Sequence, residues 1–154
     1  MTKYERLLAR AENEGTKVLE LDLGTNKECG KYFDNIIIIN SNMRTIQKYC
    51  ILSEELGHHH KTVGDITNQT KIENKKQELI ARRWGYEKLV GIVDLLNAHN
   101  HGCKTRYEIA DYLCVTESFL EETIEYYKCK YGMYYEIDNY LVYFEPNLGI
   151  FEKF

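Results

Sequence analysis

The stretch that decides the fold is Ile51-Leu52-Ser53-Glu54-Glu55-Leu56-Gly57-His58-His59-His60. Ser41-Asn42 offers an N-cap upstream, so we expect a helix that carries inward Ile46, Cys50, Leu52 and Leu56. Because a helix turns about 100° per residue, Glu54 and His58 project side by side from one face. Glu55 lies at the edge of the same face. The stretch therefore predicts two carboxylates and one imidazole at a single site.

The spacing of these three residues is typical of a metal site. In the H-E-x-x-H helix of zinc proteases, the residues at i and i+4 bind the metal and the intervening glutamate is the general base. Here the pattern is E-E-x-x-H, so Glu54 and His58 would be ligands and Glu55 would accept a proton from the attacking water. An E-x-x-x-H spacing is also common on solvated helix faces, and the spacing alone leaves that interpretation open.

The neighbouring histidines and the next helix bear on the rest of the ligand set. Three successive histidines fan out over about 200° and cannot all reach one ion, so we expect His59 and His60 to be exposed or to support the ligands. A carboxylate-rich segment, Glu73 to Glu87, coincides for most of its length with a helix predicted over residues 74–89. It can supply a third ligand, although helical spacing does not say which carboxylate that is.

The remaining patterns predict one α+β unit. A helix is expected over residues 4–12, followed by two or three strands between Lys17 and Ile39. The run Ile36-Ile37-Ile38-Ile39 is typical of a strand buried on both faces. Candidate core positions on the helix over 74–89 are Leu79, Ile80, Trp84 and Leu89. Further helices are expected over 92–98, 106–113 and 117–130, the last capped by Thr116, and a terminal hairpin over 134–137 and 140–144.

The motif helix and the helix after it together resemble the ImmA/IrrE family of metallopeptidases, in the form carried by phages and mobile elements. The resemblance rests on Ile51 to His58 and on Lys76-Gln77-Glu78-Leu79-Ile80-Ala81-Arg82-Arg83-Trp84-Gly85-Tyr86-Glu87-Lys88-Leu89. The family motif is H-E-L-G-H, followed downstream by an E-x-x-A-x-x-F/W-A helix that supplies a third ligand. Glu54 stands where the family has its first histidine.

The resemblance implies a small zincin-like metallopeptidase domain with a short N-terminal sheet, a motif helix and a C-terminal helical pair that ends in a hairpin. It implies that Glu54, His58 and Glu78 bind zinc or another divalent ion such as Mn²⁺, with Glu55 as the catalytic base. The implied reaction is cleavage of a phage or mobile-element repressor protein, which releases gene expression. Residues 1–100 would form the minimal metallopeptidase region, and residues 101–154 a helix-turn-helix-like pair plus hairpin packed as one unit with it.

The glutamate at position 54 has consequences for mechanism. One histidine and two glutamates place two negative charges on the ion instead of one, so the ion polarises its water less. Three outcomes stay open: Glu55 compensates as base, the site prefers a harder ion such as Mn²⁺, or catalysis has been lost. In the last case the protein would be an anti-repressor that binds and sequesters the repressor.

Composition bounds the other classes. The five cysteines form no C-x-x-C pair and are typical of reduced thiols, and no apolar run approaches the ~20 residues of a membrane span, so we expect a cytoplasmic protein without membrane contact. The net charge is −4. Residues 104–130 resemble a helix-turn-helix, but its second helix carries acidic residues that would meet DNA phosphates with like charge: Glu117, Glu121, Glu122 and Glu125. We therefore do not expect direct DNA binding and predict a repressor protein as the partner.

Overall fold

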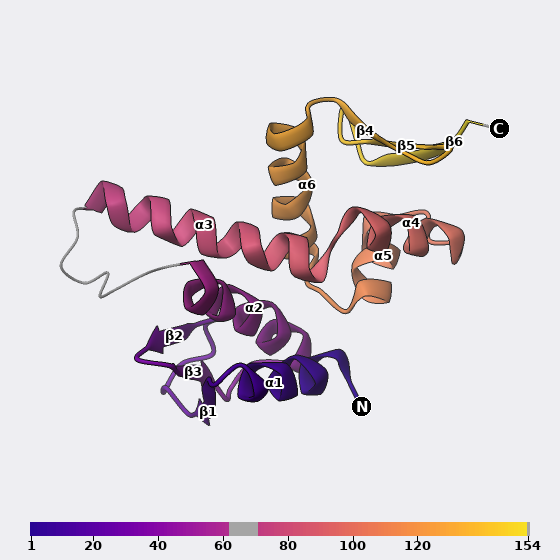
Figure 1. The fold of residues 1–154 in the computed structure, drawn as a ribbon. Coiled ribbons are helices and arrows are strands. Elements are labelled where there is room, and N and C mark those ends of the chain that lie inside the picture. The colour runs from indigo at the N-terminus through magenta and orange to yellow at the C-terminus, as the bar shows by residue number, and fades with distance from the viewer. Residues whose placement is uncertain (62–70, 154) are drawn as a thin grey trace. The chain divides into compact units, whose positions relative to one another are not determined.

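The computed structural model describes residues 1–61 and 71–153 and forms two compact units, Met1–Gly85 and Tyr86–Phe154 (Figure 1). Each unit combines helices with one small sheet, so the predicted α+β class is confirmed. The functional division at residue 100 stays a prediction. Among the described residues, no helix combines the length and apolar character that a membrane span requires.

The first unit packs helices on a three-stranded sheet. Its elements are α1 (Lys3–Asn13), β1 (Lys17–Leu21), β2 (Gly30–Phe33), β3 (Ile36–Asn40), α2 (Thr45–Lys61) and the greater part of α3 (Lys71–Leu89). The strand order is β1-β3-β2, with β1 parallel and β2 antiparallel to the central β3. Thr2 begins α1 through a capping box with Glu5. Both α1 and α2 contact the sheet.

The isoleucine run forms the central strand, but the predicted burial on both faces was wrong. Ile37 and Ile39 are 0% exposed, whereas Ile36 is 38% exposed. Side chains alternate between the two faces of a strand, so this pattern marks one buried face. A three-stranded sheet with helices packed on one side buries alternate residues, and a short apolar run does not reveal that from sequence alone.

The start of α2 also differs from the prediction. The helix begins at Thr45, so Ser41-Asn42 is not its cap. The Asn42 side-chain amide instead donates a hydrogen bond to the Asp22 carboxylate. At the start of the helix, the backbone N–H of Arg44 donates to Gln47 Oε1 at 2.9 Å. The predicted inward face is present, with Leu52 and Leu56 fully buried, Cys50 buried and Ile46 half-buried.

Helix α3 begins three residues earlier than expected and presents a different face. Leu79 and Ile80 are 43% and 44% exposed, so their assignment to the core was wrong, whereas Leu89 is buried and Trp84 half-buried. The face of α3 that meets α2 contains the small residues Ala81 and Gly85 instead. Small residues at a helix contact let two backbones approach closely, and they leave the large apolar side chains outside it.

The second unit consists of short helices and an antiparallel sheet. Its elements are α4 (Ile92–Asn100), α5 (Arg106–Leu113), α6 (Glu117–Tyr131), β4 (Tyr134–Ile137), β5 (Tyr140–Tyr143) and β6 (Gly149–Glu152), with strand order β4-β5-β6. The Thr116 hydroxyl accepts from the Phe119 N–H, as the predicted cap requires. The hairpin β4–β5 is confirmed, and β6 was not predicted because a four-residue strand carries too little alternation to recognise.

Candidate metal centre

Two pairs of small residues bring α2 and α3 together inside the first unit. A Cβ added to Gly57 would collide with the backbone of Ala81, and one added to Gly85 would lie 2.7 Å from the Ser53 hydroxyl oxygen. The pairs are four residues apart on each helix, so the two helices run antiparallel along one seam. This close approach places side chains that flank the seam within reach of each other.

Three of the predicted site residues meet beside this seam. Glu54, His58 and Glu78 each offer one ligand atom, and these atoms all lie within 4.8 Å of one another. His58 Nε2 is 3.3 Å from Glu78 Oε1, and His58 is only 5% exposed. His58 follows Gly57 directly and Glu78 lies one turn before Ala81, so the Gly57 contact explains the convergence. The sequence brought two of these residues to one helix face, and only the packing of α3 brings in the third.

The donor set fits a divalent transition ion in chemistry and in spacing. Carboxylate oxygen and imidazole nitrogen are both zinc ligands, and two ligands bound tetrahedrally at about 2.0–2.1 Å stand about 3.3 Å apart. The His58–Glu78 separation equals that value, and all three ligand atoms lie within 4.8 Å of one another. The three residues would hold the ion, while their role as ligands stays a proposal.

Glu55 is buried next to this triad. It is 7% exposed, and burial raises the pKa of its carboxyl to about 8, with the negative charges of Glu54 and Glu78 adding to the shift. Gly30 of β2 lies close to this part of α2, because a Cβ there would lie 2.6 Å from the Ile51 Cγ2 and 3.2 Å from the Glu55 Cγ. A buried carboxyl with a perturbed pKa beside possible metal ligands is typical of an acid or base in catalysis.

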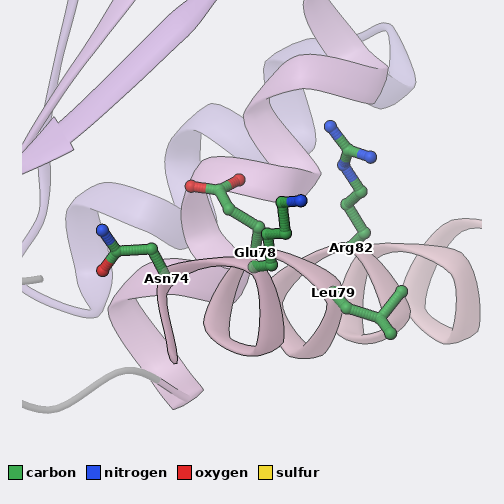
Figure 2. Close-up of a pocket in the computed structure, with 5 residues that line it drawn as sticks. Asn74, Glu78, Leu79 and Arg82 are labelled. Carbon is green, nitrogen blue, oxygen red and sulfur yellow. The ribbon is translucent and has the colours of Figure 1, made fainter. Parts of the chain in front are cut away.

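Arg82 is a site residue that sequence reasoning missed. Its Nε lies 3.3 Å from Glu54 Oε1. Figure 2 shows Arg82 and Glu78 rising from the same side of α3, where both line a pocket together with Asn74, Lys75 and Leu79. Burial raises the pKa of Glu54, and the Arg82 charge opposes that rise. One feature of the sequence could have indicated Arg82. It lies four residues after Glu78, the same spacing as between Glu54 and His58, so both pairs lie on one face of their helices.

The last two histidines of α2 do not join the triad but anchor the end of the helix. His59 Nδ1 is 2.9 Å from the Tyr32 hydroxyl of β2. His60 Nε2 is 2.6 Å from Glu14 Oε2 next to α1, and its ring stacks on Trp84 of α3 with centroids 4.8 Å apart. These contacts hold the C-terminal end of α2 against neighbouring elements of the unit. His60 is exposed, which is one of the two positions expected for it, and these contacts of both histidines go to residues outside the triad.

The fold and this site define a small α+β protein with a candidate metal centre between two helices. A peptidase family model described as "IrrE N-terminal-like domain" matches residues 11–125, which is most of the chain. The chain therefore belongs to the ImmA/IrrE family of metallopeptidase-like proteins. No curated protein and no solved structure shows significant similarity to it.

Proposed function

We propose that this protein is a metal-dependent endopeptidase that cleaves a repressor protein encoded by a phage or mobile element. The observation that carries the proposal is the meeting of Glu54, His58 and Glu78 ligand atoms within 4.8 Å, beside the buried Glu55, in a chain of the ImmA/IrrE family. The family supplies the reaction class, and the repressor is the substrate that the sequence resemblance implies.

The residues divide the work of peptide hydrolysis between them. A divalent ion held by the triad would supply Lewis acidity toward the scissile carbonyl and the attacking water. Glu55 would accept the proton of that water at a carboxylate oxygen and deliver it to the leaving amine nitrogen. The burial and negative neighbours that raise the pKa of Glu55 make its carboxylate a strong base, and a positive charge held by the triad would favour its ionised form.

The alternative function is sequestration of the repressor without cleavage. It is favoured by the carboxylate at the first ligand position, because the Arg82 Nε at 3.3 Å already provides Glu54 with a cationic partner. Such a protein would keep the fold and a docking surface while its chemistry has been lost.

The test mixes the purified protein with the repressor encoded by the same genetic element, after loading with Zn²⁺ or with Mn²⁺, and measures intact masses. Cleavage at one bond, abolished by EDTA and by Glu55→Gln, supports the endopeptidase. The Glu55→Gln protein must still bind the metal, because the amide keeps the shape of the side chain and removes only its basicity.

The matched control is Glu73→Gln, which makes the same chemical change at an exposed position of α3. Cleavage by Glu55→Gln at the wild-type rate contradicts the general-base role. Two results together would favour the sequestering anti-repressor over the endopeptidase. The metal-loaded protein would bind the repressor stoichiometrically without cleaving it, and the Glu55→Gln protein would still support induction in cells.

A further inference from the structure

Two pairs of charged or polar side chains cross between α2 and α3 in register. His58 meets Glu78 with 3.3 Å between Nε2 and Oε1, and Glu54 meets Arg82 with 3.3 Å between Oε1 and Nε. The members of each pair are separated by one helical turn from the members of the other. Glu54 thus has two kinds of partner. It offers a ligand atom to the site that it shares with His58 and Glu78, and its Oε1 accepts a hydrogen bond from the Arg82 guanidinium.

Glu54 differs from an imidazole ligand in two ways that Arg82 offsets. A carboxylate carries a negative charge and has two donor oxygens, whereas a neutral imidazole has one available nitrogen. The formal charge of Glu54, Glu78 and neutral His58 is −2, and the Arg82 guanidinium brings the cluster to −1, which is the charge of a set with two histidines and one glutamate. The Arg82 hydrogen bond occupies one lone pair of Oε1 and thereby disfavours binding of an ion through both oxygens of Glu54.

We propose that Arg82 is a positioning residue that makes Glu54 a one-atom, charge-compensated metal ligand, so that the Glu54–Arg82 pair takes the place of a histidine. This inference rests on the proposed metal site. In this role Arg82 would act on the ion through Glu54. The pair lies at the edge of the site, because the Glu54 side chain is 23% exposed and the Arg82 side chain 51% exposed.

The pair differs from an ordinary surface ion pair in its surroundings. Glu54 is a partly buried carboxylate, and Glu78 stands near it with the same charge. A nearby cation is the arrangement that offsets such repulsion. Arg82 also lines the pocket along α3 together with Glu78 (Figure 2).

The test is a double-mutant cycle on the full chain, read by metal binding and not by proteolysis. The wild type, Arg82→Gln, Glu54→His and the double variant are titrated with Zn²⁺ for affinity and with Co²⁺ for visible absorption, which is intense for four-coordinate and weak for six-coordinate ions. Lys76→Gln on the exposed part of α3 is the control for the loss of one positive charge. Circular dichroism establishes that every variant is folded.

We expect Arg82→Gln to lower the Co²⁺ absorption, because Glu54 can then bind through both oxygens. We also expect it to raise the Zn²⁺ dissociation constant by about 10-fold or more, the usual loss of affinity when a group that orients a ligand is removed. In the Glu54→His background the same substitution should leave the absorption unchanged and alter the dissociation constant by less than about 3-fold. Arg82→Lys, which keeps the charge, should recover part of the affinity but not the absorption.

Equal effects of Arg82→Gln in both backgrounds would overturn the inference while leaving the metal site in place. An effect of Lys76→Gln as large as that of Arg82→Gln would overturn it as well, because the response would then be to general charge. Absence of metal binding by the wild type and by every variant would overturn the metal site and this inference with it.

Discussion

Gly57 of α2 lies so close to Ala81 of α3 that a Cβ at Gly57 would be 2.2 Å from the Ala81 carbonyl oxygen. No side chain fits there, and the obstacle is backbone, which cannot rotate away. The contact sets the separation of the two helices at the level of His58 and Glu78. The glycine in the motif helix is therefore a condition for the site, although it contributes no ligand.

Gly57→Ala should destabilise the protein and loosen the site. In an unobstructed helix interior, replacing glycine by alanine raises the free energy of unfolding by roughly 0.5–1 kcal/mol. Here we expect the opposite, because the Ala81 backbone obstructs the added Cβ. Overpacking of this kind costs about 1–3 kcal/mol, and the outward shift of α3 should also weaken Zn²⁺ binding. Urea unfolding and a Zn²⁺ titration measure the two effects. A gain in the free energy of unfolding would show that the helices are not in contact at this point.

The raised pKa of Glu55 predicts how stability depends on pH in the metal-free protein. The pKa of Glu55 is about 8 in the folded protein, and its ordinary value is 4.5. The contribution of Glu55 to the free energy of unfolding is therefore largest below about pH 4.5, where the carboxyl is protonated in both the folded and the unfolded chain. Between these values the unfolded chain has released a proton that the folded chain retains, and stability falls as pH rises. Above about 8 the loss is complete, on the order of a few kcal/mol.

Unfolding in urea at a series of pH values, with EDTA present, measures this dependence. Glu55→Gln cannot titrate, so its free energy of unfolding should fall much less between the two pH limits. A wild type whose stability is flat over the same range would mean that Glu55 is solvated and not buried beside the triad.

The second unit offers an independent test of its packing. Tyr127 of α6 is 2% exposed, and its hydroxyl donates to the Val90 carbonyl at 2.7 Å. Tyr127→Phe removes that bond and should cost about 0.5–1.5 kcal/mol in urea unfolding. Tyr126→Phe is the matched control, because its hydroxyl bonds the exposed Glu87 and should contribute less. A larger loss at Tyr126 than at Tyr127 would contradict the buried position of the Tyr127 hydroxyl.

Local signals predicted local structure well. The helix at Arg106–Leu113 and the cap at Thr116 were correct because a capping hydroxyl and the residues it serves are neighbours in sequence. The same logic placed Glu54 and His58 on one helix face. The cap assigned to Ser41-Asn42 is the exception, because the Asn42 amide donates to Asp22, 20 residues away.

The misses come from packing between distant segments. Leu79 and Ile80 were assigned to the core because they are apolar, yet the contact with α2 is made through Ala81 and Gly85, whose small size is the relevant property. That contact also decides which carboxylate of α3 lies beside Glu54 and His58. The helical spacing of residues in the sequence could therefore not select Glu78. Arg82 was missed for the same reason, since its partner Glu54 lies 28 residues away.

The acidic second helix of the helix-turn-helix-like pair predicts that the protein does not bind duplex DNA. The glutamates of α6 at positions 117, 121, 122 and 125 are all exposed, and the whole chain has a net charge of −4. DNA affinity depends on cations that neutralise phosphates, and specific binders typically reach about 10⁻⁸ to 10⁻¹¹ M at physiological salt. Labelled operator DNA titrated at physiological ionic strength should show no binding, whereas the cognate repressor should bind or be cleaved. Submicromolar DNA binding that weakens steeply with added salt would contradict this expectation and assign the helix pair to DNA recognition.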